Sequence, residues 1–86
     1  MHGPKLAKMA NAIAQFFEGE EEEAVMLAGI ASHLERFWDP RMRRDLLDWI
    51  DHHAGEGVRP SVLAAVAARR TQWDEVLRRY PPRPAG

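Results

Sequence analysis

Apolar residues recur at steps of three and four along most of the chain, which is the spacing of one face of an amphipathic helix. The first such face follows Pro4 and consists of Leu6, Met9, Ala10, Ile13, Phe16 and Phe17. Three similar faces follow, and the four together predict helices over about residues 4–18, 20–38, 40–53 and 60–80. No segment alternates apolar and polar residues as a half-buried strand does. The predicted fold is therefore all-α, a compact bundle of four short helices.

Prolines mark helix starts and the end of the predicted domain. Pro40 cannot continue the second helix, and its ring pushes Asp39 out of the α-helical region. Asp is a favoured N-cap and Pro a favoured first helical residue, so these two residues end one helix and start the next. The Pro-rich segment 81–86 is predicted to be an extended, flexible tail, which leaves residues 1–80 as one helical domain.

The second predicted helix has two unusual features. Glu20 to Glu23 are consecutive carboxylates, and negative charge favours a helix N-terminus, so we interpret them as a solvated first turn. A cation site is the less favoured interpretation, because adjacent residues point in different directions around a helix. Gly29 lies among alanines, and this stretch of small residues predicts the close approach of another helix.

Length and composition indicate one small globular domain. The chain has 86 residues, of which 45% are apolar, and its formal net charge of −1 gives no general attraction to nucleic acid or anionic membranes. No apolar run approaches the roughly 18–20 residues that cross a bilayer, and the N-terminus lacks the apolar segment of a signal peptide. We therefore expect a cytoplasmic protein that does not associate with membranes.

The sequence shows no motif of a catalytic or metal centre. It has no cysteine, which excludes disulfides, thiolate ligands and a cysteine nucleophile. Neither Ser32 nor Ser61 lies in a Gly-x-Ser-x-Gly elbow, and no Gly-rich phosphate loop is present. The adjacent His52 and His53 are poorly placed to bind one metal ion. We predict no catalytic residue, no cofactor and no functional metal, and hence a protein that is not an enzyme.

The most informative segment joins the second and third predicted helices. Residues 33–44, here called the corner, contain two large aromatic residues and four arginines. Trp and Arg are the residue types that most often anchor protein interfaces. Phe37 and Trp38 diverge by about 100° on a helix, so one can enter the core while the other faces a neighbouring protein. The predicted partner-binding residues are His33, Arg36, Phe37, Trp38, Asp39, Pro40, Arg41, Met42 and Arg43.

The charges of the corner admit more than one interpretation. Arg41, Arg43 and Arg44 occupy the first turn of the third helix, where the macrodipole favours acidic residues instead. A carboxylate of a partner would compensate them, and so would acids of the same helix, since Arg44 and Asp48 have the spacing of an intrahelical ion pair. His33 fits either a hydrogen bond to a neighbouring helix or a contact with a partner.

The C-terminal part of the chain supports a second hypothesis. The fourth predicted helix carries Arg69, Arg70, Arg78 and Arg79, which suggests a freestanding regulatory module that binds nucleic acid. No turn of the helix-turn-helix type precedes this helix, and the whole chain is slightly acidic, so nucleic-acid binding is disfavoured. A third hypothesis is that the isolated chain forms a homodimer through the surface meant for its partner.

Three stretches of the sequence resemble the small delta subunit of bacterial NAD-dependent formate dehydrogenase. They are Lys5–Phe17, then Ala24-Val25 together with Gly29–Leu34, and Arg36–Arg43. The Phe-Trp-Asp-Pro-Arg-Met-Arg run at residues 37–43 is the most specific of them, and the segment Pro60–Ala68 is similar to the last helix of that family. The resemblance covers about residues 5–68 and leaves residues 69–86 without a counterpart.

The resemblance implies an accessory role. Such a delta subunit accompanies a molybdenum- or tungsten-dependent cytoplasmic enzyme that oxidises formate and passes electrons through iron–sulfur centres and flavin to NAD. It is associated with the catalytic alpha subunit and with assembly or stability of the complex. The lack of cysteine agrees with this role, because the chain could not hold an iron–sulfur cluster by thiolates.

Overall fold

The computed structural model describes residues 3–81, and within them the chain forms five helices and no strand. The helices are α1 (Gly3–Phe17), α2 (Glu23–Phe37), α3 (Pro40–His52), α4 (Pro60–Ala68) and α5 (Arg70–Leu77). The prediction of an all-α fold is confirmed. The predicted flexible tail falls almost wholly on residues 82–86, which lie outside the described residues.

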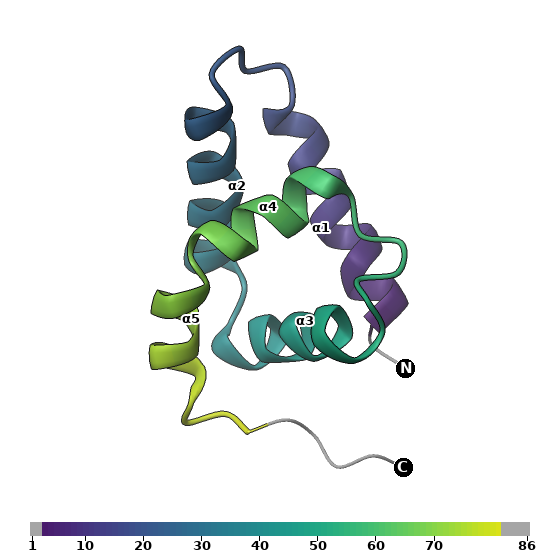
Figure 1. Ribbon diagram of the computed structural model, residues 1–86, viewed down its shortest axis with the longest axis vertical. Coiled ribbons are helices and arrows are strands. Elements are labelled where there is room, and N and C mark those ends of the chain that lie inside the picture. The colour runs from purple at the N-terminus through teal and green to yellow at the C-terminus, as the bar shows by residue number, and fades with distance from the viewer. Residues whose placement is uncertain (1–2, 82–86) are drawn as a thin grey trace.

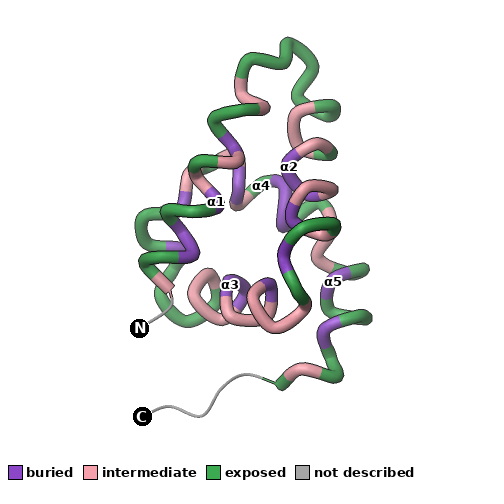
Figure 2. Tube along the Cα trace, turned by 180° about the vertical axis from the view of Figure 1, so that it is seen from behind, coloured by how far each residue is buried: buried purple, intermediate pink, exposed green. Residues whose placement is uncertain are grey.

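The five helices enclose one core. α1 and α2 run antiparallel and meet at the connection 18–22, which forms the apex of the molecule in Figure 1. α3 lies across the open base of this hairpin, and α4 crosses one face of it. α5 turns down beside α3, and the two helices pack against each other. Figure 2 shows the buried residues on the sides of the helices that face one another.

Small residues allow α1, α2 and α4 to approach closely. Ala10, Ala14, Ala31 and Ala65 have no exposed surface at all. The larger core side chains fill the remaining space; they are Leu6, Ile30, Leu34, Trp38, Leu46, Leu47, Val62, Trp73 and Leu77. Removing this apolar surface from water is the main source of stability for the fold.

Gly29 has the close neighbour that its small size predicts. A Cβ atom built on Gly29 would lie 2.6 Å from Cδ1 of Phe17, far inside normal contact distance. The ring of Phe17 therefore rests directly on the backbone of α2. This confirms the expected close approach of another helix, which is α1.

The prediction of one long fourth helix is wrong, because α4 ends at Ala68 and α5 begins at Arg70. Arg69 between them has φ −111° and ψ 11°, which is not α-helical geometry. A straight helix over residues 60–80 would be about 31 Å long, whereas the two shorter dimensions of the molecule are 25 and 20 Å. The bend returns Trp73 and Leu77 to the core, where both are buried.

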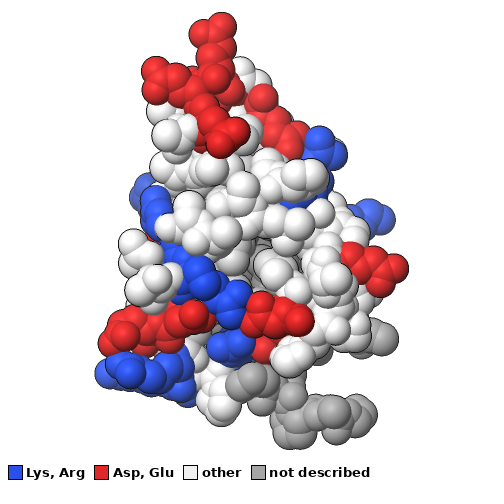
Figure 3. All heavy atoms as spheres, viewed as in Figure 1, with Lys and Arg blue, Asp and Glu red and all other residues white. Residues whose placement is uncertain are grey.

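The start of the second helix also differs from the prediction. α2 begins at Glu23, and Glu22 caps it without a side-chain hydrogen bond. Residues 18–22 form the turn that reverses the chain between two antiparallel helices, so the first glutamates cannot be helical. Figure 3 shows the acidic side chains gathered at the apex, where Glu20 to Glu23 are exposed. Their solvation is therefore as expected, but only Glu23 lies in the first helical turn.

Candidate interaction surface at the corner of α2 and α3

The turn at Asp39 and Pro40 has the predicted geometry. Asp39 adopts an extended conformation, with φ −70° and ψ 162°, and its Oδ1 accepts a hydrogen bond from the backbone N–H of Met42 at 2.9 Å. Pro40 occupies the first turn of α3, where its missing N–H leaves no unpaired donor. The N-cap prediction is confirmed. The turn fixes the angle between α2 and α3, and with it the directions of the flanking aromatic side chains.

Phe37 and Trp38 point to opposite environments. Trp38 is only 6% exposed and belongs to the core, whereas Phe37 is 69% exposed. The backbone N–H of Trp38 donates to the carbonyl of Leu34 at 3.0 Å, so Trp38 completes the last turn of α2 with its indole inside. Of the two aromatic residues, Phe37 is therefore the one that a partner can reach.

An aromatic surface extends from Phe37 along the seam between α1 and α2. The ring centroid of His33 lies 4.6 Å from that of Phe37 and 6.2 Å from that of Phe17. Phe16 lies 5.9 Å from Phe17 and is 84% exposed. We call these four residues the aromatic strip. His33 contacts two aromatic rings, and within residues 3–81 its side chain forms no hydrogen bond to another helix.

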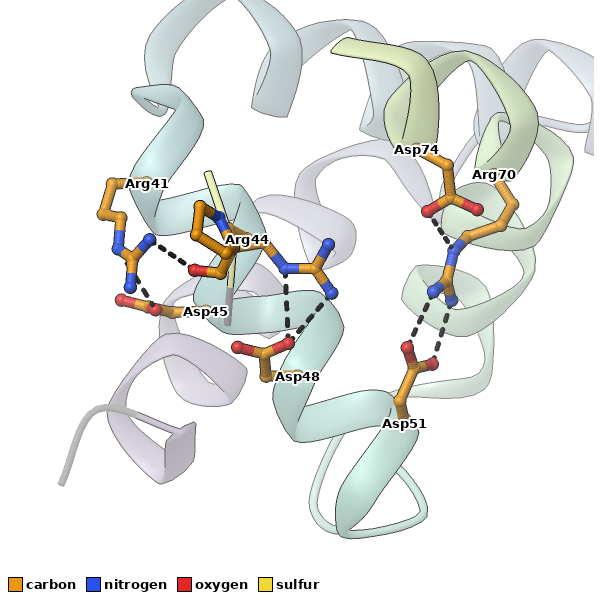
Figure 4. Close-up of polar contacts among 8 residues, drawn as sticks. Arg41, Arg44, Asp45, Asp48, Asp51, Arg70 and Asp74 are labelled. Carbon is orange, nitrogen blue, oxygen red and sulfur yellow. Dashed lines mark hydrogen bonds and ion pairs between the residues drawn. The ribbon is translucent and has the colours of Figure 1, made fainter. Parts of the chain in front are cut away.

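The arginines of the corner fall into different environments. The guanidinium of Arg36 lies 5.8 Å from the ring centroid of Phe37, and this side chain forms no ion pair within residues 3–81. Arg41 donates to the carbonyl of Pro81 at 2.7 Å and lies 3.9 Å from a carboxylate oxygen of Asp45 (Figure 4). Arg44 pairs with Asp48 at 2.9 Å, which confirms the predicted intrahelical pair. Arg36 is thus the most available cation of the corner.

Arg43 is buried instead of exposed to a partner. Its side chain is 8% exposed, and its guanidinium lies 5.5 Å from the ring centroid of Trp73. The position agrees with a cation–π contact to an indole face, while the Nε atom has no hydrogen-bond partner. α5 provides the cover over Arg43. The bend at Arg69 was not predicted, and therefore the burial of Arg43 beneath α5 was not predicted either.

The predicted partner-binding residues therefore separate by accessibility. Trp38 and Arg43 are inside the domain, so their assignment to a partner contact needs correction. Asp39 and Pro40 form the turn itself. The side chains that remain exposed or half-buried at this corner are His33, Arg36, Phe37, Arg41 and Met42.

The sequence did not predict a role for Glu35. In the structure, its carboxylate connects two helices. Its carboxylate accepts from Arg69 at 2.8 Å and from the indole N–H of Trp73 at 2.7 Å. These bonds tie α5 to α2 across a sequence separation of more than 30 residues. A buried Trp usually needs a hydrogen-bond acceptor for its indole N–H, so the sequence predicts that Trp73 has an acceptor. The sequence does not show which residue provides it.

Three of the four arginines of the predicted fourth helix, Arg69, Arg70 and Arg78, pair with carboxylates. Arg70 donates to Asp51 at 2.7 Å and to Asp74 at 2.9 Å (Figure 4), and Arg78 pairs with Glu75. The hydrogen bond from Arg70 holds the pKa of Asp51 below its ordinary value of 3.8. Electrostatic binding of nucleic acid needs several free, converging cations. The contacts of α5 therefore do not favour the nucleic-acid hypothesis.

A second group of polar contacts connects α1 to the start of α4. Asn11 accepts from the backbone N–H of Arg59 at 2.9 Å and donates to the carbonyl of Gly57 at 2.8 Å. Glu18 accepts from the guanidinium of Arg59 at 2.7 Å and also from the hydroxyl of Ser61. These hydrogen bonds, that from Arg59 first, lower the pKa of the Glu18 carboxyl below its ordinary value of 4.5.

The lowered pKa of Glu18 predicts an acid-dependent loss of stability. A carboxyl with a folded pKa below its unfolded pKa stabilises the fold above the unfolded value, and this stabilisation disappears as pH falls through the folded value. We expect the unfolding temperature of the wild-type chain to decrease as the pH is lowered below 4.5. The variant Glu18→Gln should show a smaller decrease. Circular dichroism melts over a pH series measure both. Glu20→Gln at the exposed apex is the control and should keep the wild-type profile; equal profiles for all three chains would contradict the assignment.

The comparisons with known proteins identify the family. The family model of the NADH-dependent formate dehydrogenase delta subunit FdsD matches residues 5–66, which is more than half of the 86-residue chain. The chain belongs to this family. The comparison with curated proteins found no match, and neither did the comparison with solved structures. The suspected resemblance to the delta subunit is therefore confirmed, and α5 lies beyond the matched residues.

Two further observations concern the described residues. Between residues 3 and 81, no helix has the length and apolar character to span a membrane. The same residues contain no group of three or more His, Cys, Asp or Glu side chains arranged to hold a metal ion.

Proposed function

We propose that this chain is a non-catalytic accessory subunit that binds the catalytic alpha subunit of a cytoplasmic NAD-dependent formate dehydrogenase and supports the assembly or stability of the complex. Membership of a delta-subunit family supports an accessory role within a formate dehydrogenase. The observation that carries the contact itself is Phe37, a large aromatic residue that is 69% exposed beside Arg36, a cation that forms no ion pair within residues 3–81. Covering such a side chain with a partner removes its apolar surface from water.

The corner supports this contact in two ways. Phe37 supplies an apolar anchor, and Arg36 with Arg41 supplies cations at its margin for carboxylates of the alpha subunit. Trp38 and the capped turn at Asp39 hold the anchor in place, because both are fixed by the core and by the backbone of α3. A rigid, preformed anchor loses little conformational entropy on binding, which favours affinity.

Several polar side chains of types that serve in catalysis form hydrogen bonds within the fold. Ser61 donates to Glu18, and the hydroxyl of Ser32 lies 3.4 Å from the guanidinium of Arg69. The carboxylates of Glu18, Glu35 and Asp51 each accept from an arginine. These contacts support an adaptor that leaves formate oxidation and electron transfer to other subunits.

Co-expression with the alpha subunit tests the proposal. A tagged full-length chain should retain the alpha subunit through affinity purification, and its omission should lower the yield of soluble, assembled alpha subunit. Quantitative immunoblotting of both fractions measures the two effects. An alpha subunit that accumulates equally without this chain and is not retained by it would contradict the proposed function.

A further inference from the structure

The outer face of the α1–α2 hairpin carries several exposed apolar side chains. Val25, Gly29, His33 and Phe37 follow one another at four-residue steps on α2, so they share one side of that helix. Val25 is 49% exposed, and Phe16 of α1 stands beside this row, 84% exposed. Large apolar side chains left exposed together on one face of a small domain are typical of an interaction surface.

Opposite charges stand at the two ends of this face. Glu20 to Glu23 are exposed at the apex (Figure 3), and Arg36 is exposed at the other end. None of these five side chains forms an ion pair within residues 3–81. The face is therefore bipolar, with an apolar centre, an acidic end and a cationic end.

The arrangement is symmetric about Gly29. Glu22, the extended N-cap residue of α2, precedes Gly29 by seven residues, and Arg36 in the last turn of α2 follows it by seven. At 1.5 Å per residue, each charge lies about 10 Å along the axis from Gly29. Val25 and His33 lie four residues before and after the same point. A second copy turned by 180° about this point would therefore bring the acidic end of each copy to the cationic end of the other.

We propose that the isolated chain forms an antiparallel two-fold dimer through this face, with the axis at the level of Gly29. Arg36 of each copy then faces Glu22 of the other, and the apolar side chains between these two levels cover those of the other copy. A parallel arrangement would place arginine against arginine and glutamate against glutamate, which is repulsive. The charge pattern therefore selects both the second copy as occupant and its direction.

The proposed dimer surface and the proposed surface for the alpha subunit overlap in two residues. Phe37 and Arg36 lie in both surfaces, so the second copy and the alpha subunit would compete for them. The dimer itself is a property of this chain alone, and it can be tested without the alpha subunit.

Charge exchange across the two-fold axis tests the dimer. Sedimentation velocity of the full-length chain over a concentration series at low salt should show a species of twice the 9.8 kDa chain mass. Arg36→Glu and Glu22→Arg should each raise the dimer dissociation constant by about tenfold, because each reversal opposes like charges at two symmetric positions. The double variant should recover the wild-type constant, since it restores opposite charges at both positions.

The control is Arg79→Glu, an equal charge reversal at an exposed residue of the C-terminal segment that forms no ion pair within residues 3–81. It should leave the dissociation constant unchanged, and circular dichroism should show equal helicity for all variants. A chain that is monomeric at every concentration would overturn the proposal. So would a dimer that ignores both reversals, or single reversals whose effects are not restored in the double variant. Retention of the alpha subunit is a separate measurement, so a failure here leaves the proposed function untouched.

Discussion

Replacing Trp38 with alanine is expected to destabilise the isolated chain by about 3–5 kcal/mol, the usual cost of truncating a buried tryptophan. The indole is 6% exposed and belongs to the core at the point where α2 turns into α3. A domain of this size has a total stability near the lower end of roughly 5–15 kcal/mol, so the variant should be largely unfolded near its wild-type melting temperature. Denaturant titration followed by circular dichroism measures the loss.

Trp38→Phe is the matched control for this change. Phenylalanine keeps most of the apolar surface and leaves a smaller cavity, so it should cost clearly less than alanine. Full stability in Trp38→Ala would show that the indole does not support the core. The corner would then have a different architecture, with Trp38 free to meet a partner.

Replacing Phe37 with alanine should have the opposite consequences. The ring is 69% exposed, so the free energy of unfolding should change by no more than about 0.5 kcal/mol. If Phe37 is the anchor of the alpha-subunit contact, the same change should weaken binding by more than about 2 kcal/mol, or roughly thirtyfold. Thermal unfolding of the variant measures the first quantity, and titration of purified alpha subunit measures the second.

These two residues show what the sequence predicts and where it stops. The spacing of a helix requires Phe37 and Trp38 to diverge, but it does not say which of them points inward. That choice depends on where α3 and α5 pack against α2, which is a property of the whole fold. The turn at Asp39, by contrast, depends on residues that are adjacent in sequence, and it was predicted correctly.

The break at Arg69 is a tertiary effect without a local signal. No proline or glycine interrupts residues 61–80, so the apolar period predicts one continuous helix. The break is stabilised by Glu35, which binds both Arg69 and Trp73 from a distant helix. The burial of Arg43 depends on the same bend, because Trp73 covers it only when α5 turns toward α3.

The sequence did not predict the part of the aromatic strip that lies on α1, for a related reason. Phe16 fits the apolar period of α1, and that period assigns it to the core. The inner side of α1 is filled by Leu6, Ala7, Ala10 and Ala14, whose small side chains bring α1 close to its neighbours. Phe16 lies outside this contact near the end of the helix and stays exposed. The periodicity of apolar residues alone does not distinguish a side chain buried in the domain core from one that is exposed on the surface.

The most direct test of the central claim is the affinity of the purified alpha subunit for three full-length chains, measured side by side. They are the wild type, Phe37→Ala and Val76→Ala, the last removing an exposed apolar side chain from α5, where Val76 is 51% exposed. We predict a dissociation constant raised roughly thirtyfold or more by Phe37→Ala, and an unchanged constant for Val76→Ala. Equal affinity for all three chains would contradict the assignment of the α2–α3 corner as the surface that binds the catalytic subunit.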